Sequence, residues 1–220
     1  MTISARTTIV KLKTGDLWIH SPGPLRENRE KIDELGKVAY VIAPGTYHHL
    51  YVKQWTEAYP DAKTFICPGL ATKRPGEIKF DTLLGIGTDE EFTEEFEQVF
   101  LQGRLISEVL FLHKETKTLI AVDSLEYITE KGFEEHNLEM TMWIKFWLRT
   151  VFRQQDKVLP APEYRIGGYS NVAAASKAVK TVVNDWKPTQ VILAHGELLT
   201  GEERVAEALK DCWQSLLSRP

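Results

Sequence analysis

The sequence predicts a layered α/β domain in which strands and helices follow one another without internal repeats. Three observations lead to this prediction. Short apolar runs bounded by glycine and proline alternate with longer amphipathic segments, which is typical of strands mixed with helices. Hydrophobic residues make up 43% of the chain and charged residues 26%, a balance typical of globular proteins. The 220 residues suffice for a substantial core, and we expect one domain over residues 1–220 because no linker interrupts them.

The amino-terminal segment predicts a hairpin followed by a helix. The runs Thr8–Lys13 and Leu17–Ser21 flank a Thr-Gly-Asp turn, which favours two short antiparallel strands. The polar stretch Arg26–Leu35 favours a helix and is closed by Gly36.

The next segment has the order strand, helix, strand. Val38–Ala43 is an uninterrupted apolar run, typical of a strand buried on both faces. Leu50–Tyr59 predicts a helix that stops at Pro60, and Ala62–Cys67 predicts the next strand. This order is typical of a βαβ unit. Residues 69–95 are polar, and we expect a long loop with little regular structure there.

The second half again mixes strands with helices. Strands are predicted over Gln98–Gln102, Glu108–His113, Thr118–Asp123 and Gln190–Ala194. Helices are predicted over Asn171–Trp186 and Gly201–Leu217.

The segment Met140–Phe152, MTMWIKFWLRTVF, combines aromatic and basic residues at helical spacing. Such a wide apolar surface covers a core, a dimer partner, a substrate pocket or a membrane surface. Core or dimer packing is the commonest of these, so a homodimer is possible. We expect its tryptophans, Trp143 and Trp147, to pack at a subunit contact or beside a pocket rather than to project into solvent.

Composition and charge exclude several classes of protein. The net charge of −4 and the pI of about 5.9 argue against a dedicated nucleic-acid binder, which needs a basic excess to neutralise phosphates. No apolar run is long enough for a transmembrane segment, and the amino terminus lacks the apolar core of a signal peptide. Cys67 and Cys212 form no metal knuckle and are interpreted as buried thiols. We therefore expect a cytoplasmic protein.

Histidine and aspartate residues stand where predicted strands end. His48 and His49 follow the buried strand Val38–Ala43 through a short turn. Asp123 ends the apolar run LIAVD, and His195 follows the run VILA. Each of these residues alone is commonly structural, but loops at strand ends are the usual place for sites in α/β folds. Imidazole and carboxylate groups together are preferred ligands of zinc, iron and manganese.

These positions also resemble the metallo-β-lactamase fold superfamily in order and spacing. In that superfamily a buried strand runs into an HxHxDH motif, and VIAPGTYHHLYVKQWTEAYPDAKTFI has the same layout. Counting back from Pro60 places His49 on the last histidine of the motif and His48 on its aspartate. The strand KTLIAVD, ending at Asp123, and the turn AHGE at His195 match later motifs of the superfamily. The resemblance spans most of the chain and implies a four-layer αββα sandwich, closest to a divergent uncharacterised branch.

The sequence departs from the superfamily at the first metal site. Pro44 and Thr46 stand at the first two histidine positions of the motif, and Arg104 stands at the histidine of the GHTPGS motif, within GRLISE. The resemblance therefore implies that the first site is lost, while the second survives as a mononuclear site formed by His48, His49, Asp123 and His195. Glu108, next to a motif position, either replaces a lost ligand or faces solvent.

The resemblance implies a metal-dependent hydrolase that acts on a small molecule with one divalent transition metal, zinc or iron. Two alternatives stay open: a non-hydrolytic metalloenzyme (a lyase, an isomerase or an oxygen-using enzyme) on the same fold, and a catalytically inactive binding protein. Glu197, two residues after His195, is either a general base or a solvated loop carboxylate.

Overall fold

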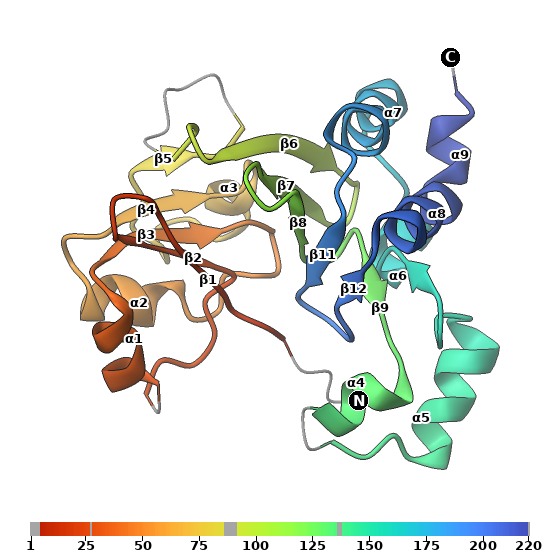
Figure 1. Ribbon diagram of the computed structural model, residues 1–220, viewed down its shortest axis with the longest axis horizontal. Coiled ribbons are helices and arrows are strands. Elements are labelled where there is room, and N and C mark those ends of the chain that lie inside the picture. Colours follow the sequence, from red (N-terminus) through yellow and green to blue (C-terminus); the bar gives the residue numbers. More distant parts are fainter. Residues whose placement is uncertain (1–4, 27, 86–91, 136–137, 220) are drawn as a thin grey trace.

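Two five-stranded sheets lie face to face, and helices cover the outer face of each sheet (Figure 1). The structure is a computed structural model that describes residues 5–26, 28–85, 92–135 and 138–219. The architecture is the predicted αββα sandwich. Among the described residues, no helix combines the length and apolar character that crossing a membrane requires.

The first sheet contains the hairpin and the βαβ unit that the sequence predicts. Its strands, in spatial order, are β1 (Thr8–Lys11), β2 (Leu17–His20), β3 (Val38–Ala43), β4 (Lys63–Ile66) and β5 (Thr82–Leu83). β1 pairs antiparallel with β2, and β2 to β5 run parallel to one another. The helices of this half are α1 (Arg29–Leu35), α2 (Val52–Ala58) and α3 (Leu70–Lys73).

The second sheet is mixed and brings two distant segments of the chain side by side. Its strands, in spatial order, are β12 (Leu199–Thr200), β11 (Gln190–Leu193), β8 (Thr118–Ala121), β7 (Ser107–His113) and β6 (Phe96–Gln102). β11 runs parallel to β8, whereas the other neighbours are antiparallel. Its outer face is covered by α7 (Val172–Lys180), the π-helical segment η2 (Thr181–Trp186), α8 (Glu202–Cys212) and α9 (Gln214–Leu217).

Short elements connect β8 to α7. They are β9 (Glu126–Tyr127), α4 (Glu130–Glu135), α5 (Met142–Phe146), the π-helical segment η1 (Trp147–Val151), β10 (Val158–Leu159) and α6 (Pro162–Gly167). β9 and β10 form a separate two-stranded sheet. Apart from the helical spacing of Met140–Phe152, the sequence did not predict these elements, because strands of two residues and helices of six residues are too short to show a periodic pattern.

Alternation along the strands divides the core into layers. In β7, Val109 and Phe111 face the first sheet, whereas Leu110 and Leu112 face the helices of α7 and η2. In β3, Tyr40 and Ile42 point between the sheets and the intervening residues point toward α2. Both faces of these strands are buried, which explains why their sequences are continuous apolar runs rather than alternating ones.

Two expected elements differ in the structure. The segment 69–95, expected to be a loop, contains α3 and β5, and its residues 86–91 lie outside the described residues. The last helix was expected to run from Gly201 to Leu217, but it ends at Cys212 because Trp213 leaves helical geometry at φ −111°. The Trp213 side chain is buried against the outer face of the second sheet, so tertiary packing interrupts the helix there.

We predict that Phe111→Ala destabilises the protein by about 3–5 kcal/mol, because it leaves a cavity between the sheets. The Phe111 ring is fully buried and lies edge-on to Trp18, with ring centroids 5.1 Å apart. The matched control is Phe80→Ala, which removes a ring that is 40% exposed and should change stability by less than about 1 kcal/mol. Urea unfolding of both variants checks the prediction, and equal losses would contradict the layer assignment.

Candidate metal centre

Asp123 and His195 are brought together by the register of two parallel strands. Ala121 of β8 lies opposite Leu193 of β11, so the residues two positions further along each strand are level with one another. The amide of Ala194 donates to the carbonyl of Ala121 at 3.0 Å and extends the pairing to the turn. The carboxyl ends of both strands thus direct their next polar residue to the same edge of the sheet.

His48 reaches this edge from the other sheet. It lies in the turn after β3, and backbone hydrogen bonds fasten that turn to the start of β7. Thr46 N donates to Ser107 O at 2.9 Å, and Val109 N donates to Pro44 O at 2.7 Å. These bonds cross from one sheet to the other, so His48 is held above the end of the second sheet.

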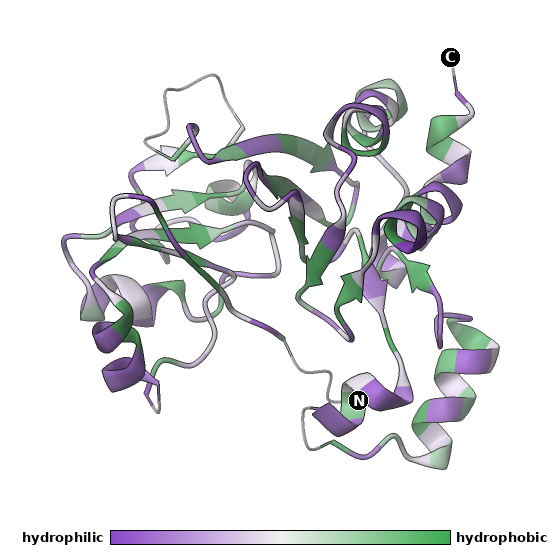
Figure 2. Ribbon diagram, in the orientation of Figure 1, coloured by the Kyte–Doolittle hydropathy of each residue, from purple (hydrophilic) through white to green (hydrophobic). Residues whose placement is uncertain are grey.

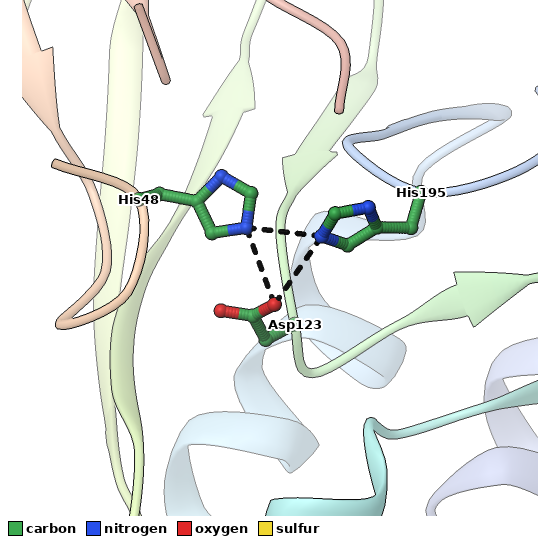
Figure 3. Close-up of side chains that lie close together, drawn as sticks. All are labelled: His48, Asp123 and His195. Carbon is green, nitrogen blue, oxygen red and sulfur yellow. Dashed lines mark hydrogen bonds and ion pairs between the residues drawn. The ribbon is translucent and has the colours of Figure 1, made fainter. Parts of the chain in front are cut away.

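The side chains of His48, Asp123 and His195 point at one another (Figure 3). The Nε2 atom of His48 lies 3.2 Å from Asp123 Oδ1 and 3.2 Å from His195 Nε2. His195 Nε2 lies 3.6 Å from the same Asp123 oxygen. The three potential ligand atoms therefore form a nearly equilateral triangle.

The size of this triangle fits a single metal ion. Atoms that bind a tetrahedral zinc ion at about 2.0–2.2 Å are roughly 3.3–3.6 Å apart, close to the three distances at the site. A second observation agrees: Asp123 Oδ2 is buried without a hydrogen-bond partner among the described residues. A buried carboxylate oxygen that lacks a partner is costly, and a cation beside the carboxylate offsets that cost.

Electrostatics favour the ionised form of Asp123. Burial alone would raise the pKa of its carboxyl group, but the charge of His48 and hydrogen bonds from His195 and His48 outweigh burial and hold the pKa below its usual range. The other ring nitrogen of His48, Nδ1, lies 2.7 Å from Ser21 Oγ, which fixes the orientation of the ring.

Glu108 positions Asp123 and is not part of the triangle. Its buried carboxylate accepts hydrogen bonds from Asp123 N at 2.6 Å, Ser124 N at 2.7 Å and Ser124 Oγ at 2.7 Å. Of the two roles the sequence left open for Glu108, exposure to solvent is wrong, since the side chain is inaccessible. Burial and the charge of Asp123 raise the pKa of Glu108 to about 7.

The turn that carries His195 depends on a glycine. Gly196 has φ +93°, and a Cβ at this position would lie 1.9 Å from the carbonyl oxygen of Tyr127. The carbonyl of Gly196 also accepts a hydrogen bond from the guanidinium of Arg6 at 3.1 Å. Only glycine combines this backbone conformation with such a close approach.

A cavity of about 720 Å³ opens on the three side chains. Its lining includes the apolar and aromatic side chains of Tyr47, Leu50, Tyr51 and Ile106 and the carboxyl groups of Glu126 and Glu163. Sequence reasoning missed Glu126. It is buried, and burial raises its pKa to about 8. The available signal was a glutamate between two hydrophobic residues three positions after Asp123.

Two of the expected site residues lie apart from this group. His49 lines the cavity, but the group that gathers around Asp123 does not include it. Burial and the charges of Arg74 and Lys73 lower the pKa of His49, and its Nδ1 is buried without a partner among the described residues. Its imidazole thus lies near the positive charges of Arg74 and Lys73, apart from the triangle.

Glu197, expected as a catalytic base or a solvated carboxylate, is held by the segment around α4. Its carboxylate accepts hydrogen bonds from Thr129 Oγ1 and Lys131 Nζ, both at 2.9 Å. Its pKa is lowered, because bonds to Lys131 and Thr129 outweigh the effect of burial. This contact joins the turn after His195 to α4.

Solved structures with the same fold include metallo-β-lactamases. The DIM-1 metallo-β-lactamase has a TM-score of 0.62 at 11% identity, with 97% of this chain and 88% of that chain covered. The metallo-β-lactamase from Pontibacter korlensis has a TM-score of 0.62 at 10% identity, covering 100% and 90%. FIM-1 from Pseudomonas aeruginosa, in its mono-zinc form, has a TM-score of 0.55 at 10% identity, covering 98% and 86%. The chain thus has the metallo-β-lactamase fold.

The family can be stated more narrowly. A search of curated protein sequences finds no match. The profile of a domain of unknown function, DUF4336, matches residues 1–194, and the chain belongs to this family.

We predict that Gly196→Ala displaces the His195 turn and destabilises the protein more than Gly15→Ala. Both glycines have positive φ, +93° and +88°, but a Cβ on Gly15 meets no atom within 4 Å. Gly15→Ala should therefore cost only the backbone strain of about 1–2 kcal/mol, whereas Gly196→Ala adds the clash with Tyr127. Thermal unfolding of the two variants checks the order, and equal destabilisation would show that the turn accommodates a side chain.

Proposed function

We propose that this chain is a hydrolase that acts on a small molecule with one divalent metal ion bound by His48, Asp123 and His195. The triangle of two imidazole nitrogens and one carboxylate oxygen, with edges of 3.2, 3.2 and 3.6 Å, carries the proposal. Two histidines and one carboxylate are a donor set that hydrolytic zinc enzymes use, with the remaining position open to water and substrate. The fold shared with metallo-β-lactamases supports the same class of reaction.

A bound metal ion of this kind supplies Lewis acidity and lowers the pKa of a coordinated water. The chain's own residues fix the three donors in advance. Ser21 orients the His48 ring through Nδ1, Glu108 holds the backbone of Asp123, and the Gly196 turn places His195. Such supports keep donor atoms at their positions, so little reorganisation is needed when the ion binds.

Glu126 is the residue best placed to supply a proton. It lines the cavity beside Asp123 and His195, and Gln154 Nε2 donates a hydrogen bond to its Oε2 atom. A neutral carboxyl group at a cavity wall can protonate the leaving group of a hydrolysed substrate. The positioning by Gln154 keeps the Glu126 side chain at this wall.

The lining of the cavity suggests the class of substrate. Among the described residues, the lining contains carboxyl, imidazole and hydroxyl groups but no lysine or arginine. Lys73 lies behind the wall, where its Nζ is 3.4 Å from the centroid of the Tyr47 ring and donates to Thr46 O. We infer a small substrate that is neutral or cationic and has an apolar part in contact with Tyr47, Leu50 or Tyr51.

The donors available among the described residues are sufficient for one metal ion only. Thr46, at one of the lost histidine positions, uses its hydroxyl to accept a hydrogen bond from Ser107 N at 3.1 Å, and Arg104 is exposed. Within the described parts of the chain, no second group of three histidine, cysteine or carboxylate ligands gathers. These observations support a mononuclear site.

The same donor set favours a second candidate function. Two histidines and one carboxylate also form the facial triad of non-haem Fe(II) enzymes that use oxygen. An oxygen-using iron enzyme is therefore the alternative to a hydrolase. The two candidates differ in the metal that supports turnover and in the need for oxygen.

We predict that the protein binds one Zn²⁺ per chain and that His195→Ala and Asp123→Asn abolish tight binding. His49→Ala should still bind one equivalent, because His49 lies outside the group. His113→Ala, at the far end of β7, is the control.

At a free zinc concentration of about 100 times Kd, the ion should stabilise the wild type by about 2.7 kcal/mol. Calorimetric titration and thermal unfolding with and without zinc provide the measurements. Binding that survives Asp123→Asn and His195→Ala, or that is lost in His49→Ala alone, would contradict the assignment.

We predict that the zinc-loaded protein hydrolyses neutral esters or lactones and prefers them to anionic analogues of the same size. His195→Ala should lose this activity, because the ion has lost a donor, while His113→Ala should retain it. The measurement is substrate turnover by zinc-loaded, chelated and Fe(II)-loaded protein, with oxygen uptake followed in parallel. Turnover that needs Fe(II) and consumes oxygen would favour the iron enzyme, and no metal-dependent turnover in any form would leave the inactive binding protein.

A further inference from the structure

The helix formed by α5 and η1 presents an aromatic face to solvent. This aromatic face consists of Met142, Trp143, Phe146 and Trp147. Met142 is 81% exposed, Trp143 66% and Phe146 50%. The rings pack on one another: Trp143 stacks on Phe146 at 6.0 Å and meets Trp147 edge-on at 5.6 Å. Within the single chain Trp143 is therefore not covered, and the expected packing at a subunit contact stays a prediction.

The opposite side of the helix fixes it to the body of the protein. Leu148 is buried in a small cluster with Ile128, Phe133 and Met140. Thr141 caps the start of α5, its hydroxyl accepting a hydrogen bond from Ile144 N at 3.3 Å. Figure 2 shows hydrophobic and hydrophilic turns alternating along this helix, which lies at a corner of the molecule. A structured helix that holds a cluster of large apolar side chains in water indicates an interaction surface.

The charged residues within the helical segment are basic, whereas Glu139 and Asp156 flank it, and Glu130 and Glu134 of α4 line a hollow together with Met142. From Met140 to Gln155, the charged residues are Lys145, Arg149 and Arg153, and the sequence contains no acidic residue there. Lys145 pairs with Glu130 of α4, and the exposed Arg149 donates through Nε to Gln155 at 2.9 Å. The basic side chains Arg149 and Arg153 therefore lie at the carboxyl end of the helix, and the acidic side chains lie toward its start.

The charge pattern helps to decide whether the aromatic face binds a second copy of the chain or a lipid surface. In a symmetric dimer the aromatic face would cover itself, and it holds no acidic side chain to pair with Arg149 and Arg153. An anionic lipid surface instead offers phosphate groups to the arginines and an interfacial region that accommodates tryptophan and phenylalanine rings. We propose that the aromatic face of α5 and η1 docks on an anionic lipid surface, with Arg149 and Arg153 at the headgroups.

Contacts at the end of η1 tie this face to the cavity. Gln154 donates to Glu126, which lines the cavity, and Arg165 of α6 donates to the carbonyl of Phe152. Ile166, next to Arg165, is also 81% exposed. Docking therefore fixes the orientation of the cavity relative to the lipid surface. The proposal does not depend on the reaction at the metal centre.

The test is co-sedimentation of the full chain with vesicles of phosphatidylcholine alone and of phosphatidylcholine mixed with phosphatidylglycerol. The wild type should bind the mixed vesicles, and its tryptophan emission should shift to shorter wavelength. Trp143→Ser with Phe146→Ser should weaken this binding at least about tenfold, because buried apolar area is lost. Arg149→Gln with Arg153→Gln should weaken it by about thirtyfold and remove the dependence on salt.

Matched controls distinguish docking through the aromatic face from nonspecific binding by other exposed apolar side chains and from the effects of misfolding. Leu35→Ser with Phe80→Ser removes side chains that are 48% and 40% exposed outside the aromatic face, and binding should not change. Circular dichroism and urea unfolding confirm that each variant is folded. The proposal is overturned if the wild type does not bind the mixed vesicles or if the aromatic variant binds them as tightly. It is also overturned if sedimentation velocity shows a dimer that only the aromatic variant disrupts while vesicle binding is absent.

Discussion

The buried carboxylate of Glu108 lies where the two sheets meet the candidate metal centre. Its oxygens accept hydrogen bonds from the backbone of Asp123 and Ser124, and its own backbone bridges to Gly45 in the turn that leads to His48. One residue therefore fixes both the loop that carries the carboxylate of the triangle and the turn that carries one of its histidines. Removing an acceptor that satisfies several buried donors is expensive, because each donor left without a partner costs about 1–3 kcal/mol. The geometry of the centre therefore depends on this interaction.

Much of this arrangement could be predicted from residue patterns. The continuous apolar runs of β3, β7 and β8 indicate strands buried on both faces, and together with the spacing of histidine and aspartate they indicate the metallo-β-lactamase fold. Asp123 and His195 each follow such a run, and the parallel register of β8 and β11 explains why they lie level. A charged residue at the start of an otherwise apolar strand, as in SEVLFLH, was the signal that Glu108 is buried with partners.

Other features depend on information that spacing does not contain. His48 and His49 are adjacent in a turn, and only the backbone angles of that turn decide which ring points at Asp123. The role of Glu126 arises from packing among short elements without periodicity. The helical spacing of Trp143 and Trp147 indicated an amphipathic helix, but not which side faces the protein. That side is decided by Leu148, which packs with Ile128 and Phe133 from other elements.

The three side chains of the triangle are divided between the sheets: Asp123 and His195 follow strands of one sheet, and His48 follows a strand of the other. A chain in which only the second sheet had formed would offer a metal ion two donors, and the third would arrive when the first sheet docked. Chelation by three donors is much stronger than by two, so an ion at this position would link the two sheets and stabilise their packing against each other. Metal affinity would then report, during folding or in a damaged variant, whether the two halves of the sandwich have closed on each other.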